Sequence, residues 1–233
     1  MSHNVAILLF SRTAGEEALH KSFSTRRRAV NRRIAGHLIS HAESVARQSG
    51  LPVVHVSSAR QRGDTFGERL VSAFRLVFAE GYDKVLAIGN DCPYLTPGLL
   101  QAAADRLQTQ EVVLGPARDG GAYLIGLSAE GFRGDDFGQL AWQTPACYAS
   151  LLAYCHAHGL PCAQLPPHHD LDTRRDVSHF LRSRHPAEPL RALVQCIDNL
   201  LKDSDLSFPT APEALATPFP GTIHLRRGPP PAP

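Results

Sequence analysis

Short apolar runs alternate with helical patterns along most of this 233-residue chain, and this alternation constrains the fold more than any other feature. The run from Lys84 to Ile88, for example, is apolar and β-branched at two positions, as expected of a strand that is covered on both faces. We expect strands at Val5 to Phe10, Leu51 to Val56, Lys84 to Ile88, Glu111 to Pro116, Ala122 to Leu127 and Cys162 to Leu165. The pattern predicts an α/β fold of three layers, with helices on both faces of a mostly parallel sheet.

Start and stop signals mark the helices between these strands. Thr96 and Pro97 are a typical N-cap and first helical residue, and Gly50 and Gly81 end two earlier helices. The tight turn from Arg118 to Gly121 is too short for a helical crossover, so the strand after it runs antiparallel or lies elsewhere in the sheet. We expect a polar loop after the first strand and helices from about Ser24 to Ser49, Thr65 to Glu80, Thr96 to Leu107, Pro145 to His158, Thr173 to Arg184 and Pro189 to Leu201.

The composition is that of an ordinary soluble protein with one sizeable domain. Hydrophobic residues make up 43% of the chain, and no apolar run approaches the roughly 18 residues that a membrane span needs. The run Val5 to Phe10 is too short for a signal peptide and has no basic flank, so we expect a cytoplasmic protein. We expect one domain over residues 1–201 and a mobile, proline-rich tail over residues 202–233. The sequence indicates no particular oligomeric state.

Charge and cysteine content argue against several other classes of protein. The formal net charge of +2 is too small to indicate nucleic-acid binding. The arginines at Arg26–Arg28 and Arg32–Arg33 are either a solvated helix face or a patch that steers a phosphorylated substrate. The five cysteines include no C-x-x-C pair, which favours reduced thiols over a zinc site or a disulfide framework.

The segment Gly89-Asn90-Asp91-Cys92-Pro93 places one carboxylate directly after the expected strand Lys84 to Ile88. Gly89 allows an unusual turn, and Pro93 prevents the strand from continuing. In open α/β sheets, ligands bind outside the carboxyl ends of the strands, where an aspartate can hold a divalent metal against a phosphate. The alternative is that Asp91 is a turn residue that caps the next helix.

A second acidic segment, His168-His169-Asp170-Leu171-Asp172-Thr173, lies just before an expected helix for which Thr173 is a suitable N-cap. We predict that Asp172 shares a metal ion with Asp91, with Asp170 as the second choice, while the other aspartate supports the loop. Both aspartates could instead cap the helix. Hard oxygen ligands around a diphosphate favour Mg²⁺ or Mn²⁺, and the two histidines leave zinc as an alternative.

Two glycine-containing segments are candidate ligand contacts. Gly63, Asp64 and Arg69 lie at the start of an expected helix, where free backbone N–H groups can bind an anion; an ordinary helix cap is the alternative. Asp119-Gly120-Gly121 is either a simple hairpin turn or a place where a ligand approaches the backbone closely. The sequence has no Walker A loop, no G-x-G-x-x-G after the first strand and no G-x-S-x-G elbow, so ATPase, dinucleotide-binding and serine-hydrolase functions lack their main evidence.

Four motifs occur along the chain in this order: Gly63-Asp64-x-x-Gly67-Glu68-Arg69-Leu70, Ile88-Gly89-Asn90-Asp91-Cys92-Pro93-x-Leu95-Thr96, Val113-Leu114-Gly115-Pro116-Ala117-x-Asp119-Gly120-Gly121-x-Tyr123-Leu124-Ile125-Gly126-Leu127 and Asp170-Leu171-Asp172-Thr173. Together they resemble the bacterial DUF2064 group of the GT-A-fold nucleotide-diphospho-sugar transferase superfamily. Some members of that group are described as glycosyltransferases of arsenosugar biosynthesis. The resemblance covers roughly Val5 to Arg184, and the block from Gly63 to Leu127 is its most specific part.

The resemblance implies a Rossmann-like GT-A sheet that binds a nucleotide-activated donor through Mg²⁺ or Mn²⁺. Asp91 matches the family's strand-end metal carboxylate, and Asp172 matches the position that often completes the metal site. The family usually has a proline-glycine loop and a Lys-Thr-Arg-Leu run after its first strand. In this chain, Arg12 and Lys21 are instead the candidates to bind the diphosphate. Glu16 and Glu17 lie between them in the sequence, and their negative charges are unfavourable for diphosphate binding.

Sugar transfer from a nucleoside diphosphate donor is the function that the resemblance favours. A metal ion on Asp91 and Asp172 would neutralise the departing diphosphate, and Asp119 is the candidate base for an acceptor hydroxyl. One alternative is nucleotidyl transfer of the guanylyltransferase kind, in which the same ion assists attack on the α-phosphate of a triphosphate. Another is a non-catalytic nucleotide-binding protein, which the altered first loop suggests. The expected partner is a nucleotide sugar or nucleotide, not a nucleic acid.

Overall fold

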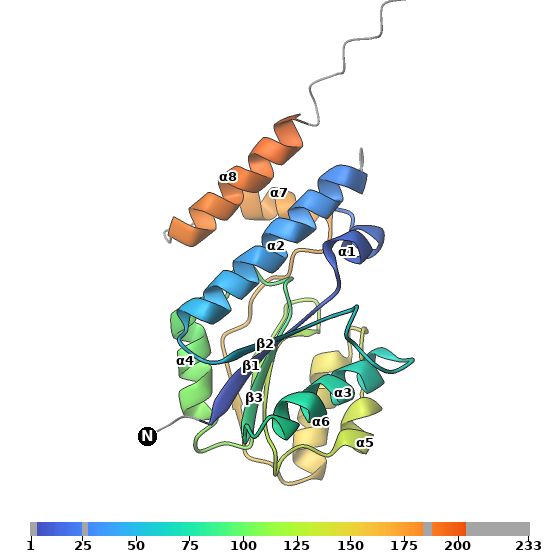
Figure 1. Cartoon of the computed structure of the whole chain (residues 1–233), viewed down its shortest axis with the longest axis vertical. Coiled ribbons are helices and arrows are strands. Elements are labelled where there is room, and N and C mark those ends of the chain that lie inside the picture. Colours follow the sequence, from blue (N-terminus) through green and yellow to red (C-terminus); the bar gives the residue numbers. More distant parts are fainter. Residues whose placement is uncertain (1–3, 25–27, 184–187, 204–233) are drawn as a thin grey trace, which may run out of the picture.

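A computed structural model describes residues 4–24, 28–183 and 188–203 of the chain. The described part contains a six-stranded sheet with the strand order β2-β1-β3-β5-β4-β6 (Figure 1). The strands are β1 (Val5–Ser11), β2 (Val53–Ser57), β3 (Lys84–Ile88), β4 (Val112–Pro116), β5 (Ala122–Ser128) and β6 (Cys162–Gln164). Because β1 pairs in parallel with β2 and β3, and β4 pairs in parallel with β6, the predicted mostly parallel sheet is confirmed.

β5 is the strand that runs against the others, since it pairs antiparallel with both β3 and β4. A tight turn joins it to β4, and within this turn the Ala117 N–H donates to the Gly121 carbonyl at 3.0 Å. The short link therefore gives an antiparallel neighbour, as expected. The pairing of Leu124 with Ile88 brings the start of β5 to the same sheet edge as the end of β3.

Helices cover both faces of the sheet, which confirms the three-layer α/β fold (Figure 1). α2 and α4 pack on one face, with Ala46 and Leu100 in its buried core. α3, α5 and α6 pack on the other face, around Phe74, Phe137 and Leu151. The helices are α1 (Ala14–His20), α2 (Arg28–Gln48), α3 (Phe66–Ala79), α4 (Pro97–Arg106), α5 (Gly134–Gly138), α6 (Cys147–Ala157), α7 (Arg174–Arg182) and α8 (Glu188–Asp203).

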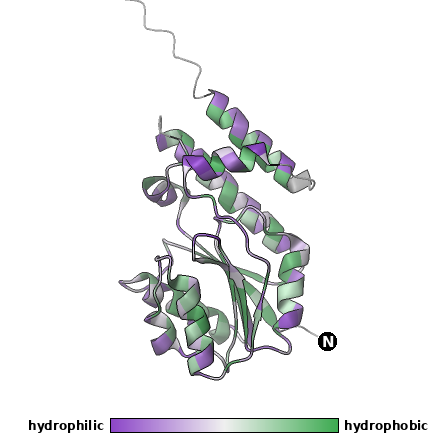
Figure 2. Cartoon of the chain, turned by 180° about the vertical axis from the view of Figure 1, so that it is seen from behind, coloured by the Kyte–Doolittle hydropathy of each residue, from purple (hydrophilic) through white to green (hydrophobic). Residues whose placement is uncertain are grey.

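The N-terminal half of α2 extends past the sheet and packs with α7 and α8 (Figure 1). Ile34 and Leu38 of α2 share a buried cluster with Phe180 of α7 and Ile197 of α8. Apolar and hydrophilic residues alternate along these helices in Figure 2, as expected of helices with one buried face. Phe23, just after α1, is fully buried in the same cluster, so the cluster also holds the chain directly after α1.

Two short helices, α1 and α5, were not expected from the sequence. The predicted polar loop after β1 is wrong, because residues 14–20 form α1. Thr13 begins this helix through a capping box, in which the Thr13 hydroxyl accepts from the Glu16 N–H at 3.4 Å and the Glu16 carboxylate accepts from the Thr13 N–H at 3.2 Å. The T-x-x-E pattern is thus the sequence signal for α1, whereas α5 has no side-chain cap.

The remaining helices begin and end within a few residues of their expected bounds. Thr96 and Thr173 are N-caps whose side chains accept a backbone hydrogen bond, as predicted, and Thr65 caps α3 in the same way. All five cysteines are free thiols. Among the described residues, no helix combines the length and apolar character that crossing a membrane requires. The expected tail lies outside the described residues from 204 onward, so the domain limit at residue 201 stays a prediction.

Candidate active site

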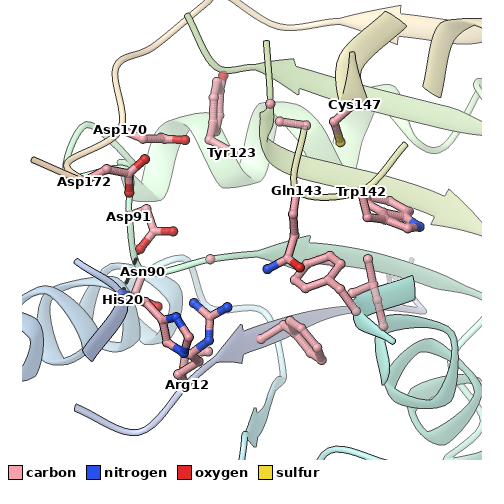
Figure 3. A pocket seen from close by; sticks show the side chains of 18 of the residues that line it. Arg12, His20, Asn90, Asp91, Tyr123, Trp142, Gln143, Cys147, Asp170 and Asp172 are labelled. Atoms are coloured by element: carbon pink, nitrogen blue, oxygen red, sulfur yellow. Dashed lines mark hydrogen bonds between the residues drawn. The ribbon is translucent and has the colours of Figure 1, made fainter. Parts of the chain in front are cut away.

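A cavity of about 610 Å³ opens at the sheet edge where β1 and β3 end and β5 begins. Its wall includes the ends of these strands, the first turn of α3 and the segments 142–147 and 170–172. The volume is in the range of small-molecule binding sites. Figure 3 shows the carboxylates of Asp91, Asp170 and Asp172 together on one side of this cavity and Trp142 on the other. The cavity therefore has a charged end and an aromatic end.

Asp91 lies directly after β3, a central strand of the sheet, and its side chain lines the cavity. The residues on either side of it, Asn90 and Cys92, are each 3% exposed and hold the turn in place. The Asn90 side-chain amide donates to Asp91 Oδ1 at 2.9 Å. The Asp91 side chain itself is 36% exposed, so a ligand can reach it.

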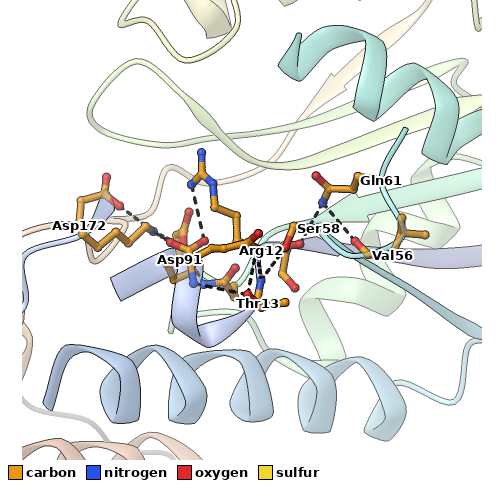
Figure 4. Close-up of polar contacts among 12 residues, drawn as sticks. Arg12, Thr13, Val56, Ser58, Gln61, Asp91 and Asp172 are labelled. Atoms are coloured by element: carbon orange, nitrogen blue, oxygen red, sulfur yellow. Dashed lines mark hydrogen bonds and ion pairs between the residues drawn. The ribbon is translucent and has the colours of Figure 1, made fainter. Parts of the chain in front are cut away.

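The segment before α7 crosses the same sheet edge and brings Asp172 next to Asp91. The Leu171 N–H donates to the Asp91 carbonyl at 2.8 Å, and the Ser22 N–H donates to the Asp172 carbonyl at 3.2 Å. These backbone hydrogen bonds tie the segment to the end of β3 and to the chain after α1. Figure 4 shows the side chains of Asp91 and Asp172 directed toward the same space.

Lys21 fills the space between these two carboxylates. Its Nζ lies 2.8 Å from Asp172 Oδ1, forms an ion pair with Asp91 Oδ1 and lies 4.0 Å from Glu17 Oε2. The side chain of Lys21 is only 8% exposed. Burial by itself would lower the pKa of Lys21, but the three carboxylates outweigh it and raise the pKa well above its ordinary value. Lys21 is therefore a fixed positive charge at this edge.

Glu17, on α1, is the buried ion-pair partner of the two cations that flank this helix, Arg12 and Lys21. It is 3% exposed, and its Oε1 lies 3.8 Å from Arg12 Nη1. Burial raises the pKa of the Glu17 carboxyl. Glu16 has a different role, because its carboxylate accepts a hydrogen bond from the Thr13 hydroxyl at 2.9 Å as part of the N-terminal cap of α1. The two glutamates thus have structural partners, and Glu17 holds Arg12 and Lys21 at the cavity wall.

Asp170 adds a third carboxyl to the charged end. Burial raises the pKa of Asp170 to about 8, and the charges of Asp91, Asp119 and Asp172 add to this rise. Its Oδ1 is buried and has no hydrogen-bond partner among the described residues. The helix that follows is capped by a Thr173 capping box that uses the side chain of neither Asp170 nor Asp172. The alternative of two helix-capping aspartates is therefore wrong.

Aromatic rings line the opposite end of the cavity. The ring centroid of Phe66 lies 5.7 Å from that of Phe10 and 5.6 Å from that of Trp142. Gln143 follows with a φ of 59°, a left-handed conformation that is uncommon for residues other than glycine and is often found at functional sites. Arg69 also reaches this wall, and its buried Nε has no hydrogen-bond partner among the described residues. This aromatic end offers the flat apolar surface of the rings, with the polar side chains of Gln143 and Arg69 beside it.

Gly63 and Asp64 are not among the residues that line the cavity. The Asp64 N–H donates to the Glu68 carboxylate at 2.7 Å, within the start of α3. Gly63 has a φ of 130°, and a Cβ there would lie 2.6 Å from the Cβ of Glu68. Both residues therefore shape the start of α3, which in turn carries Arg69 to the cavity wall.

The turn Asp119-Gly120-Gly121 presents Asp119 and Gly121 to the cavity. Asp119 Oδ1 accepts from the Gly121 N–H at 2.9 Å, which fixes the carboxylate at the wall. Gly120 packs away from the cavity, where an added Cβ would lie 2.1 Å from the carbonyl oxygen of Pro145 at a φ of 94°. Only glycine fits that position.

Four residues that line the cavity were not expected from the sequence: Phe10, Phe66, Trp142 and Gln143. Phe10 and Phe66 carry an indirect signal, because one ends the first strand and the other begins the helix that follows Gly63. Trp142 and Gln143 lie in an irregular segment between α5 and α6, where no periodic pattern indicates their direction. They become recognisable only once the fold brings that segment to the sheet edge.

The carboxylates suit a divalent ion that a phosphate ligand helps to bind. Asp91 and Asp172 already contact one cation, the Lys21 ammonium, so their oxygens converge on one point. Within the described residues, no three His, Cys, Asp or Glu side chains form a group that could hold a metal. Mg²⁺ commonly binds through one or two carboxylates together with substrate phosphates and water. His168 stacks on Tyr94, which does not favour the zinc alternative.

Solved structures share this fold, and one of them carries the name of a nucleotide-diphospho-sugar transferase. A crystal structure from Desulfovibrio desulfuricans G20, provisionally named as such a transferase, has a TM-score of 0.75 at 23% identity, over 88% of this chain and 99% of that one. A homologue of Rv0371c from Mycobacterium sp. strain JC1 has a TM-score of 0.48 at 11% identity, over 84% and 99%. A cytidylyltransferase from Leptospira borgpetersenii has a TM-score of 0.40 at 12% identity, over 89% and 99%.

The family model described as "Uncharacterized protein conserved in bacteria (DUF2064)" matches residues 26–144, about half of the chain. This protein therefore belongs to the DUF2064 family, and the resemblance that the four motifs indicated is confirmed. No curated protein sequence matches the chain.

Proposed function

We propose that this protein is a glycosyltransferase that uses a nucleoside-diphosphate-sugar donor together with Mg²⁺ or Mn²⁺. One observation carries the proposal: Asp91 and Asp172 converge on a single cation position at one end of a cavity of about 610 Å³. This edge is where ligands bind in open α/β sheets, at the carboxyl ends of the strands. The shared fold with the Desulfovibrio structure supports the same class of substrate.

In this proposal the donor's diphosphate lies at the charged end of the cavity. Asp91 and Asp172 would hold the divalent ion, which when bound neutralises the diphosphate that leaves the sugar. Arg12 would add a charge-assisted hydrogen bond to a phosphate oxygen, oriented by Glu17 at 3.8 Å. The Arg12 side chain is 29% exposed, so a diphosphate can reach it.

The nucleoside would extend toward the aromatic end. Phe10, Phe66 and Trp142 offer ring surface for a base, and stacking of one base on an aromatic side chain contributes about 1–3 kcal/mol. Arg69, whose Nε has no hydrogen-bond partner among the described residues, would donate to the base or to the ribose. Gly121 would contact the donor through its backbone, while Gly63, Asp64 and Gly120 shape the wall.

Asp119 is the candidate base for the acceptor hydroxyl. One of its carboxylate oxygens accepts from the Gly121 N–H, and the other would take the proton. Asp170 would play a different part, because burial and the neighbouring carboxylates raise its pKa to about 8 in the ion-free site, which favours the protonated carboxyl near neutral pH. A protonated Asp170 can donate a hydrogen bond to a sugar or acceptor hydroxyl.

A thermal-shift panel of nucleoside diphosphates, nucleotide sugars and triphosphates, each with and without Mg²⁺ or Mn²⁺, tests the proposal. Diphosphates and nucleotide sugars should raise the melting temperature by roughly 5–10 °C at about 100 times Kd, and only with the ion. Asp91→Asn should remove this ion-dependent rise while the unliganded protein stays folded. Asp135→Asn is the matched control, since Asp135 lies on α5 with its side chain 99% exposed.

Each other outcome of the panel contradicts the proposal in a recognisable way. Stabilisation by triphosphates but not by diphosphates would favour nucleotidyl transfer. No response to any nucleotide would favour the non-catalytic alternative. An unchanged ion-dependent response in Asp91→Asn would show that the ion is held elsewhere.

A further inference from the structure

The Lys21 ammonium occupies the place that a divalent ion between Asp91 and Asp172 would need. Nζ contacts Asp91 Oδ1 directly and lies 2.8 Å from Asp172 Oδ1. Divalent ions bind carboxylate oxygens at about 2.0–2.6 Å, so the ion and the ammonium cannot fit between the same oxygens together. One of the two positive charges has to leave when the other arrives.

We propose that Lys21 is a resident cation that competes with the divalent ion and keeps it out until a nucleotide binds. The inference rests on the ion site proposed above and adds the residue that controls when this site is filled. It predicts weak ion binding to the protein alone, because an ion has to displace an ammonium held by two carboxylates.

The structure provides a second position for the displaced ammonium. Glu17 Oε2 lies 4.0 Å from Lys21 Nζ, is buried and has no hydrogen-bond partner among the described residues. The flexible stem of a lysine allows Nζ to shift by the short distance that would turn this ion pair into a hydrogen bond. Lys21 would then leave Asp91 and Asp172 to the ion and still keep its charge beside the diphosphate.

This exchange makes ion binding and diphosphate binding cooperative. A diphosphate supplies the oxygen ligands that the two carboxylates lack, and it attracts the displaced ammonium. By linkage, the diphosphate raises the affinity for the ion by the same factor by which the ion raises the affinity for the diphosphate. In the absence of nucleotide, Lys21 neutralises the two carboxylates and prevents them from collecting stray cations.

The test measures binding of Mn²⁺ alone, by titration calorimetry or by the electron paramagnetic resonance signal of free Mn²⁺. Lys21→Met should bind Mn²⁺ at least about ten-fold more tightly than the wild type, the scale on which groups around a metal change its affinity. Adding Asp172→Asn to Lys21→Met should abolish this gain. If Lys21→Met fails to fold, Lys21→Gln keeps a hydrogen-bond donor between the carboxylates without the charge.

Two control variants separate local competition from general electrostatics. Lys84→Met makes the same chemical change at the start of β3, where Lys84 Nζ donates to Gln108 at 3.2 Å, and should leave the Mn²⁺ affinity unchanged. Arg12→Met removes a cation of the same cavity that pairs with Glu17 and not with Asp91 or Asp172. A gain from Arg12→Met equal to that from Lys21→Met would overturn the proposal. So would unchanged Mn²⁺ affinity in Lys21→Met.

Failure of this inference can be told apart from failure of the proposed function, because the measurement uses the metal alone. A gain in Mn²⁺ affinity in Lys21→Met supports the competition even if no nucleotide binds to any variant. Conversely, if ion-dependent nucleotide binding is found but Mn²⁺ alone binds Lys21→Met and wild type equally, the function stands and the competition is overturned.

Discussion

The two ends of the cavity differ in what a ligand meets there, ion pairs at one end and aromatic rings at the other. At the charged end, Lys21 and Arg12 are paired with carboxylates, and the buried Glu17 contacts both of them. At the aromatic end, Phe66 lies among other rings, and the buried Arg69 Nε has no hydrogen-bond partner among the described residues. A ligand therefore has to rearrange existing ion pairs at one end, whereas at the other it mainly covers apolar surface.

This difference predicts two distinct dependences on conditions. Interactions between charges at a partly exposed site weaken as salt rises, because the screening length falls from about 10 Å at 0.1 M to about 3 Å at 1 M. Burial of ring surface does not depend on charge and is not screened in this way. A nucleoside diphosphate spans both kinds of contact, and inorganic pyrophosphate reaches only the first.

Removing a cation from the charged end should have the largest effect. Arg12→Ala should weaken binding of a nucleoside diphosphate and of pyrophosphate about ten-fold, since a charge-assisted hydrogen bond contributes roughly 1.5–3 kcal/mol. The loss should shrink when calorimetry is repeated at high salt. Arg47→Ala is the matched control, because Arg47 pairs with Glu43 on the exposed face of α2.

If the nucleoside diphosphate and pyrophosphate bind Arg12→Ala and wild type equally, the prediction for the charged end is wrong. In that case the ion pair of Arg12 with Glu17 is purely structural, and the variant should instead show a lower melting temperature. A loss that does not change with salt would show that Arg12 acts through packing.

Removing a ring from the aromatic end should have a smaller and more selective effect. Phe66→Leu should weaken binding of a nucleoside diphosphate by roughly three- to ten-fold, because stacking contributes about 1–3 kcal/mol and leucine keeps part of the apolar contact. Pyrophosphate binding and the salt dependence should stay unchanged. Phe78→Leu is the control, since Phe78 lies on the same helix and packs on Phe74.

Equal weakening of pyrophosphate by Phe66→Leu would contradict the division into two ends, because it would mean that the ring positions the charged groups as well. No weakening of either ligand would place the base elsewhere, and the irregular segment that carries Gln143 would be the next candidate. The pyrophosphate measurement separates these outcomes.

The fold could be predicted largely from local patterns, and the exceptions have local causes. Short apolar runs and capped helices indicated the strands and the three layers, because strands buried on both faces are continuously apolar and helices with one buried face repeat their apolar residues with the helical period. α1 could not be predicted from its hydrophobic pattern, because its seven residues are too few to show a helical repeat and its buried residue is a glutamate, Glu17. The capping-box pattern from Thr13 to Glu16 is the local sequence signal that indicates α1.

Part of the cavity lining could be predicted from the sequence, but the arrangement of its charged groups could not. Asp91 and Asp172 could be named from their positions beside a strand and a helix. That Lys21 would lie between them could not, because its position depends on α1, whose buried Glu17 lies beside it, and on the hydrogen bond from Ser22 to the Asp172 carbonyl. The left-handed backbone of Gln143 likewise depends on tertiary packing, since glutamine has no preference for that conformation.

The smallest expected effect concerns the reactivity of Cys147, which tests how far solvent reaches the aromatic end of the cavity. Cys147 lines the cavity at the start of α6, and burial, with a contribution from the charge of Asp119, raises its pKa to about 11. Because the thiolate is the reactive form, alkylation by iodoacetamide should be slow at pH 7.5 and rise roughly ten-fold per pH unit toward pH 11. Cys196 on α8 is exposed and should be alkylated first, which makes it the internal control in peptide mapping by mass spectrometry. A nucleoside diphosphate bound with Mn²⁺ should slow Cys147 further without affecting Cys196, whereas alkylation of both at equal rates at pH 7.5 would show that this end of the cavity is open to solvent.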